Sequence, residues 1–240
     1  LKLNNKNFKL AILYLMKVIQ LDKINFLYKS NSQDTSAGFI DSLLSKLNVR
    51  YEVSEEDLNN IPQSGALISV SNHPFGGLDG LILLSLLKRR RDDFKIIANQ
   101  ILSKIPELSE NFIPVNPFDK KGNTEANLSG IKKIINHLRH DGAIGLFPAG
   151  EVSAFQTDTL KIEDRKWSKS AAKIIYKSDT PVIPIYFSGT NGILFNLLGM
   201  IHPSLRTLRL PTELLNKKDC VVKVRIGNVI EVAGTTAVED

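Results

Sequence analysis

Short apolar runs alternate with longer amphipathic segments through most of this chain, and this alternation limits the folds it can adopt. The run from Ala66 to Val70 is apolar and β-branched and ends at a polar loop, which is typical of a buried strand. Similar runs predict strands at residues 94–98, 112–115, 143–147, 182–187 and 221–226. Apolar residues at helical spacing predict helices between them, at residues 81–87, 123–140 and 167–176. The expected fold is α/β, with a mostly parallel central sheet flanked by helices and ligands at the carboxyl ends of the strands.

The first fifty residues differ from the rest because their patterns are helical and lack strands. Residues 1–30 are expected to form a helix with a broad apolar face interrupted by lysines, and residues 39–47 form a second one. We therefore expect an N-terminal helical segment at residues 1–50 and an α/β domain at residues 51–240. The apolar faces and lysines suit contact with a membrane in its plane. Packing against the α/β domain is the competing interpretation.

Length, charge and cysteine content narrow the class of protein. The 240 residues are enough for a sizeable core, and the single cysteine, Cys220, excludes an internal disulfide or a cysteine-based zinc site. Lys plus Arg is 31 and Asp plus Glu is 25, so the formal net charge is +6. The basic residues are scattered without an aromatic platform, so nucleic-acid binding is not expected. Short basic clusters, such as residues 88–91, could meet anionic lipid or phosphate groups, although a solvated helix end or loop explains each cluster better when it is taken singly.

His73 is the first candidate for a catalytic residue. It follows the strand predicted at residues 66–70 and precedes Gly76 and Gly77, which allow a tight turn. Asp79, six positions after His73, can fold back and accept a hydrogen bond from one ring nitrogen, which raises the basicity of the other. The alternative is a structural histidine in a turn, with Asp79 capping the next helix.

Three further motifs lie in or after predicted strands. Residues 147–153 read Phe-Pro-Ala-Gly-Glu-Val-Ser and form a charged, glycine-containing loop at a strand end, where such sheets place ligand contacts. Residues 111–118 and 182–189 are apolar strands punctuated by proline. Taken singly, the first motif is a turn with an exposed Glu151, and the other two belong to the core.

Together and in this order, the four motifs resemble the blocks of the phospholipid/glycerol acyltransferase family, the lysophospholipid acyltransferase superfamily. That family has a His-x4-Asp block after a strand, a second block with an acceptor-binding loop, a Phe-Pro-Glu-Gly-Thr-Arg-Ser block and a late apolar block containing proline. The resemblance covers roughly residues 65–190. Residues 72–80, 98–102, 147–153 and 201–207 look closer to a bacterial hemolysin-like branch, which includes O-acyltransferases of ornithine- and glycine-lipid synthesis.

The resemblance implies a glycerolipid acyltransferase-like fold and a direct mechanism. His73, with Asp79 beside it, is implied to act as general base on a lyso-lipid hydroxyl, which attacks the thioester of acyl-CoA or acyl carrier protein. The thioester is the co-substrate, and neither a cofactor nor a metal is implied. The oxyanion needs donors, most simply backbone N–H groups near Gly76, Gly77 or Gly150. The residues implied to bind substrate are Asn72, Phe75, Gly76, Gly77, Asn99, Phe147, Pro148, Gly150, Glu151 and Ser153. The implied location is the cytoplasmic face of a membrane, as a peripheral or monotopic protein.

Departures from the family pattern bear on the site and on the acceptor. Five residues rather than four separate His73 from Asp79. Ala149 and Val152 stand where the family has Glu and Arg, and those residues help to hold a glycerol phosphate in relatives. Their loss argues against a phosphate-directed acceptor, and Glu151 suits an amine or hydroxyl. We expect a lyso-ornithine lipid, a lyso-glycine lipid or a lysophospholipid as acceptor. The alternatives are a lysophosphatidate acyltransferase and a non-catalytic lipid-binding protein on the same fold.

Overall fold

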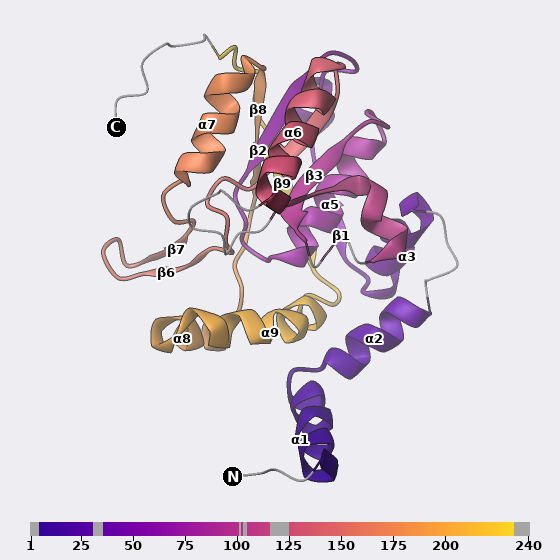
Figure 1. The fold of residues 1–240 in the computed structure, drawn as a ribbon, viewed down its shortest axis with the longest axis vertical. Coiled ribbons are helices and arrows are strands. Elements are labelled where there is room, and N and C mark those ends of the chain that lie inside the picture. The colour runs from indigo at the N-terminus through magenta and orange to yellow at the C-terminus, as the bar shows by residue number, and fades with distance from the viewer. Residues whose placement is uncertain (1–4, 31–35, 101, 103–104, 116–124, 233–240) are drawn as a thin grey trace.

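The computed structural model describes residues 5–30, 36–100, 102, 105–115 and 125–232 (Figure 1). The elements in chain order are α1 (Asn5–Val18), α2 (Leu21–Lys29), α3 (Ser36–Lys46), β1 (Arg50–Glu52), α4 (Glu55–Asn59), β2 (Leu67–Ser71), α5 (Gly77–Lys88), β3 (Lys95–Asn99), the 3-10 helix η2 (Pro106–Asn111), β4 (Phe112–Val115), α6 (Glu125–Arg139), β5 (Ala143–Leu146), β6 (Ala154–Gln156), β7 (Lys161–Glu163), α7 (Lys169–Ser178), β8 (Val182–Phe187), α8 (Ile193–Ile201), α9 (Pro203–Asn216) and β9 (Val221–Ile226). Every strand expected from the sequence is present, with its ends shifted by at most one residue. Of the proline-containing segment at residues 111–118, residues 116–118 lie outside the described part of the chain.

The central sheet has seven strands in the order β1-β9-β8-β2-β5-β3-β4 (Figure 1). All neighbouring strands run parallel except β8 and β9, which are antiparallel. The α/β class with a mostly parallel sheet is therefore confirmed. Strand β2 lies between β5 and β8, so the loops after these three strands emerge at one edge of the sheet. That edge is where a sheet of this kind places its ligands.

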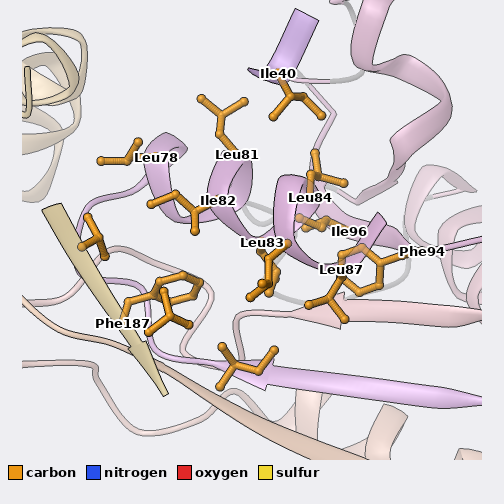
Figure 2. Close-up of a cluster of buried hydrophobic side chains, with 14 of the residues drawn as sticks. Ile40, Leu78, Leu81, Ile82, Leu83, Leu84, Leu87, Phe94, Ile96 and Phe187 are labelled. Atoms are coloured by element: carbon orange, nitrogen blue, oxygen red, sulfur yellow. The ribbon is translucent and has the colours of Figure 1, made fainter. Parts of the chain in front are cut away.

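Helix α5 is buried on nearly all sides, because it lies between the central sheet and helix α3. Nine of its twelve residues are buried, because the sheet covers one side and α3 covers the other. Figure 2 shows Leu83 and Leu87 close to Phe94 and Ile96, with Ile40 of α3 on the opposite side of the helix. Each such side chain contributes about 1.5–3 kcal/mol when it is fully buried. The packing holds the first turn of α5 in a fixed place beside the end of β2.

The opposite face of the sheet is covered by α6 and α7. Ile134 and Leu138 of α6 and Ile175 of α7 form a second apolar cluster with Ile68 of β2 and Ile144 of β5. The strands at the centre are thus buried on both faces. This explains why every residue of β2 and β5 is buried, including Ser69 and Ser71 of β2.

The N-terminal residues form separate helices, which corrects the single helix expected over residues 1–30. The backbone of Gln20 is left-handed, with a φ of 57°, so the chain turns between α1 and α2. The described side chains of these two helices are exposed or partly exposed, whereas α3 buries Phe39, Ile40 and Leu44 in the core. The division of the chain at residue 50 stays a prediction. None of the helices in the described ranges has the length and hydropathy needed to cross a membrane.

Candidate active site

His73 and Asp79 lie together at the carboxyl edge of the sheet. His73 follows β2 directly, and Asp79 lies in the first turn of α5. The Nδ1 atom of His73 is 3.0 Å from the Oδ2 atom of Asp79. The Nδ1 atom has no hydrogen-bond partner, so the contact with Asp79 is a close electrostatic one. The imidazole is 19% exposed and the carboxylate is fully buried. Among the described residues, the Nε2 atom has no hydrogen-bond partner.

The turn before α5 holds the Asp79 carboxylate in place. Its Oδ2 atom accepts hydrogen bonds from the backbone N–H groups of Phe75 at 2.8 Å and Gly76 at 2.9 Å. Gly76 has a φ of 87°, in the left-handed region, and a Cβ there would meet Leu210 at 3.1 Å. This tight turn accommodates the additional residue between His73 and Asp79. Asp79 therefore both caps α5, as its third residue rather than its N-cap, and faces the imidazole.

The pKa of Asp79 reflects a balance between burial of the carboxyl and the polar groups that contact it. Burial raises the pKa of this carboxyl above its usual value, and contact with His73 and the two backbone N–H groups opposes that rise. Burial has the larger effect because the carboxylate is completely removed from water. Keeping the Asp79 carboxyl ionised near neutral pH therefore costs free energy.

Replacing Asp79 with asparagine tests this balance through the pH dependence of stability. Because the pKa of Asp79 is raised in the folded state, the protonated carboxyl stabilises the fold, and this stabilisation is complete below the unfolded-state pKa of about 3.9. The stabilisation is lost as the pH rises through the folded-state pKa. Asparagine does not titrate, and its side-chain oxygen can still accept from Phe75 and Gly76. We expect the free energy of unfolding of Asp79→Asn, relative to wild type, to increase from about pH 4 to neutral pH. Urea unfolding of both proteins over this range measures it, and a decreasing difference would show that the donors outweigh burial.

The His73 ring and backbone are supported by the loop after β5 and by the segment after β7. Phe147 stacks on the imidazole, with ring centroids 4.0 Å apart and an interplanar angle of 28°. The backbone N–H of Ser153 donates to the His73 carbonyl at 2.9 Å. Asp164 accepts from the His73 backbone N–H at 3.2 Å and from the Ser153 hydroxyl. Asp164 was not predicted, because it lies 91 residues from His73 in the chain and belongs to no motif.

The side chains of Asn72 and Phe75 contact other residues of the chain. The Asn72 side chain donates to the Phe187 carbonyl at 2.9 Å and accepts from the Phe187 N–H at 2.7 Å, so it ties the end of β2 to β8. Phe75 is buried, and its ring lies where a side chain on Gly189 would be. The Lys217 ammonium is 4.9 Å from the centroid of the same ring. These contacts position the His73 loop, and a direct contact of Asn72 or Phe75 with substrate stays a prediction.

The remaining predicted residues lie at the start of α5 and after strands β5 and β3. The backbone of Gly77 opens α5, and this residue is exposed. Pro148 is buried, and its carbonyl accepts from Ser168 at 2.9 Å. Gly150 has a φ of 72°, and its N–H donates to Phe147 at 3.0 Å. Asn99 ends β3, which β5 separates from β2, so it lies farther along the edge than the other predicted residues.

Glu151 is paired with two arginines that come from other parts of the chain. Its Oε1 atom lies 3.2 Å from Arg165 Nε, and its Oε2 atom accepts from Arg206 Nη2. Burial lowers the pKa of Arg206, and the charge of Glu151 opposes this effect. The Glu151 carboxylate is therefore already paired with two guanidinium groups, those of Arg165 and Arg206.

Replacing Glu151 with glutamine is expected to lower the free energy of unfolding by about 1–2 kcal/mol. The Arg206 side chain is 6% exposed and would lose its carboxylate partner, while the one-third exposure of Glu151 reduces the effect through solvent screening. Arg165→Gln is the matched control, because Arg165 is more than half exposed and its loss should cost less than about 0.5 kcal/mol. Urea unfolding measures both variants. Equal effects would show that Arg206 does not depend on Glu151.

Comparison with known proteins shows the family to which the chain belongs. The chain belongs to the acyltransferase family, because the sequence profile described as "Acyltransferase" matches residues 2–239. The resemblance seen in the four motifs is thereby confirmed. A lyso-glycine lipid O-acyltransferase from Phocaeicola vulgatus is 27% identical over 229 residues, which cover 92% of this chain and 79% of the relative.

Two further similarities were found. A lyso-glycine lipid O-acyltransferase from Bacteroides thetaiotaomicron is 27% identical over 198 residues, which cover 82% of this chain and 70% of the relative. Among solved structures, the 1-acyl-sn-glycerophosphate acyltransferase PlsC from Thermotoga maritima aligns with a TM-score of 0.49 and 16% identity. That alignment covers 96% of this chain and 89% of the solved chain.

Proposed function

We propose that this chain is a lyso-lipid O-acyltransferase that uses His73 as its general base. The observation that carries the proposal is the arrangement at the end of β2, where Nδ1 faces a buried carboxylate and Nε2 has no partner among the described residues. The names of the two relatives, both lyso-glycine lipid O-acyltransferases, support a lyso-lipid as the acceptor.

The reaction needs one proton acceptor and one attacking oxygen. His73 Nε2 takes the proton of the acceptor hydroxyl, and the negative charge of Asp79 stabilises the imidazolium that forms. The hydroxyl oxygen attacks the carbonyl carbon of an acyl thioester, held as acyl-CoA or acyl carrier protein. When the tetrahedral intermediate collapses, the carbon–sulfur bond breaks and the departing thiolate takes the proton from His73. The stacked Phe147 ring keeps the imidazole in one orientation throughout.

The oxyanion of that intermediate is proposed to bind at the start of α5. The N–H groups of Gly76 and Gly150 already donate to Asp79 and Phe147, so they are not free for this role. The N–H of Gly77 has no partner among the described residues and lies at the positive end of the helix. Gly77 is therefore the most suitable of the three donors considered from the sequence.

The acceptor headgroup is proposed to lie near Glu151. The absence of the family arginine at Val152 argued against an anionic headgroup, but Arg165 and Arg206 bring guanidinium groups to the same loop. The loop therefore suits a headgroup that carries both a polar and a negatively charged group, such as a headgroup derived from an amino acid. Aminolipids remain the proposed acceptors on this basis.

An acyl-transfer assay on the full chain tests the proposal. Palmitoyl-CoA and palmitoyl-acyl carrier protein would each be offered with lyso-glycine lipid, lyso-ornithine lipid and lysophosphatidate. We expect turnover with an aminolipid to exceed turnover with lysophosphatidate by about tenfold or more. Turnover with lysophosphatidate alone would identify a lysophosphatidate acyltransferase instead. Binding of lyso-lipid without any turnover, unchanged in His73→Ala, would support a non-catalytic lipid-binding protein.

A further inference from the structure

Strands β6 and β7 form a hairpin that is separate from the central sheet (Figure 1). Ala154 pairs with Glu163 in the antiparallel register of this hairpin. The residues just outside that pair, Ser153 and Asp164, therefore face each other across the base of the hairpin. The Ser153 hydroxyl donates to the Oδ1 atom of Asp164, so a side-chain hydrogen bond joins the two ends.

Both ends of the hairpin also bind the backbone of His73. The His73 N–H donates to the Oδ1 atom of Asp164 at 3.2 Å, and the His73 carbonyl accepts from the Ser153 N–H at 2.9 Å. Together with the bond between Ser153 and Asp164, these contacts close a ring of three hydrogen bonds. The ring holds the peptide groups on both sides of the His73 Cα atom. We call Ser153 and Asp164 the His73 clamp.

The clamp holds the chain at a point that the sheet no longer supports. Strand β2 ends at Ser71, two residues before His73. Pro74, the next residue, has no N–H that could fix the backbone. With its two neighbouring peptides held, the Cα atom of His73 is fixed, and the imidazole extends from a defined point. The clamp therefore sets where the ring meets Asp79 and Phe147.

The clamp depends on one oxygen atom of Asp164. The Oδ1 atom accepts from the His73 N–H and from the Ser153 hydroxyl, and Ser153 itself is buried. No arginine, lysine or histidine within the described part of the chain forms an ion pair with Asp164. A side-chain amide oxygen has the same two lone pairs as this carboxylate oxygen. The arrangement therefore requires an acceptor oxygen at this place and does not require a charge.

We propose that Asp164 is a positioning residue that holds His73 in place for proton transfer. The inference rests on the proposed function, because Asp164 acts only through His73 as the general base. Its carboxylate contacts the backbone N–H of His73 and not the ring. Position matters because a displacement of about 1 Å at a reacting group can lower a rate by about 10²-fold. The competing role is a purely structural one, in which Asp164 only ties the hairpin to the fold.

Kinetics of acyl transfer by Asp164→Ala and Asp164→Asn test the positioning. Alanine removes the acceptor, so we expect kcat to fall by about 10–100-fold while the KM for the acyl thioester changes by less than about threefold. Asparagine keeps an oxygen that can accept from the same two donors, so its kcat should stay within about fivefold of wild type. A wild-type kcat in Asp164→Ala would overturn the proposal.

Asp158→Ala is the matched control. Asp158 lies at the exposed tip of the same hairpin, and its side chain accepts from the Thr159 N–H at 3.0 Å. Its replacement removes the same carboxylate from the same hairpin without touching the clamp. The kcat of Asp158→Ala should equal that of wild type. A loss in Asp158→Ala as large as that in Asp164→Ala would overturn the proposal, because the whole hairpin would then be sensitive.

A double-mutant cycle with His73→Ala separates positioning from a structural role. If Asp164 acts through the imidazole, its replacement with alanine should change the residual rate of His73→Ala by less than about twofold. A further loss by the same factor as in wild type would show that Asp164 supports the fold in general, and it would overturn the proposal. A His73→Ala enzyme within about tenfold of wild type would instead contradict the proposed function itself.

Asp164→Glu keeps the test decisive if Asp164→Ala does not fold, as circular dichroism would check. Glutamate keeps the charge but moves the oxygen by one methylene group, away from the place where the two donors of the clamp meet. We therefore expect a lower kcat in Asp164→Glu than in Asp164→Asn. The opposite order, with an active glutamate variant and an inactive asparagine variant, would assign the effect to charge and overturn the positioning role.

Discussion

Replacement of His73 with alanine is expected to lower the acyl-transfer rate by about 10³-fold. A positioned general base contributes roughly 10²–10⁴-fold to the rate of such a step, and the Nε2 atom is the base in the proposed mechanism. The fold should survive, because the imidazole is partly exposed and the ties to Ser153 and Asp164 run through the His73 backbone. The measurement is kcat with the preferred donor and acceptor, together with the thermal unfolding midpoint.

His140→Ala is the matched control for this change. His140 is exposed just after α6, and among the described residues its ring hydrogen-bonds to the Asn136 carbonyl of that helix. Its replacement should leave kcat unchanged. Asp79→Asn should reduce kcat by about 10²-fold, because the carboxylate that stabilises the imidazolium is gone while the turn is kept. A His73→Ala enzyme within tenfold of wild type would show that another group takes the proton.

Arg91→Ala is expected to lower the free energy of unfolding by about 3–5 kcal/mol. The Arg91 side chain is 2% exposed and makes two hydrogen bonds to Asp93, at 2.8 and 2.7 Å. It also donates to the carbonyls of Pro62, Gly65 and Asp141, so it joins three loops at the amino-terminal edge of the sheet. Truncation would remove these five hydrogen bonds at once, although Asp93, which is 37% exposed, would keep the one from the Ala143 N–H. A domain of this kind is stable by only about 5–15 kcal/mol, so the loss is a large one.

Arg89→Ala is the control, because it removes the same side chain two residues away. Arg89 is 65% exposed, and its contact with Asp41 spans 3.6 Å, so its loss should cost less than about 0.5 kcal/mol. Urea unfolding of the two variants measures the contrast. Similar values would show that the Arg91 contacts do not stabilise the fold. Arg91 belongs to the basic cluster at residues 88–91. Because its side chain is buried, it cannot contact a lipid or a phosphate group.

The sheet and the core of the site could be predicted because their signals are local. Strands β2, β5 and β8 are mainly apolar runs bounded by turns, and both faces of the sheet are covered at β2 and β5, where every residue is buried. His73, Gly76 and Asp79 lie within one loop, so their spacing along the chain already indicates how they meet. The antiparallel direction of β9 was not predictable from its own residues, which alternate as they would in either orientation.

The rest of the site depends on contacts between distant segments. Asp164 and Arg206 reach the site from 91 and 55 residues away from their partners, and no spacing rule connects them. Helices α8 and α9 were also missed. Gly199, Pro203 and Pro211 interrupt their pattern, and such residues usually indicate turns. Pro203 opens α9, where its missing N–H costs nothing, so here it marks a helix start.

The pairing of β1 with β9 has a consequence for how the chain is made. Arg50 aligns with Val221, and β9 is the only strand beside β1 in the seven-stranded sheet that the described residues form. At a synthesis rate of about 5–20 residues per second, the ribosome needs roughly 10–30 s to add the residues between them. During that interval β1 is an unpaired strand edge on a nascent chain. The N-terminal part of the protein therefore completes its folding only after the last strand has left the ribosome, and a chain truncated before residue 221 would keep that edge open.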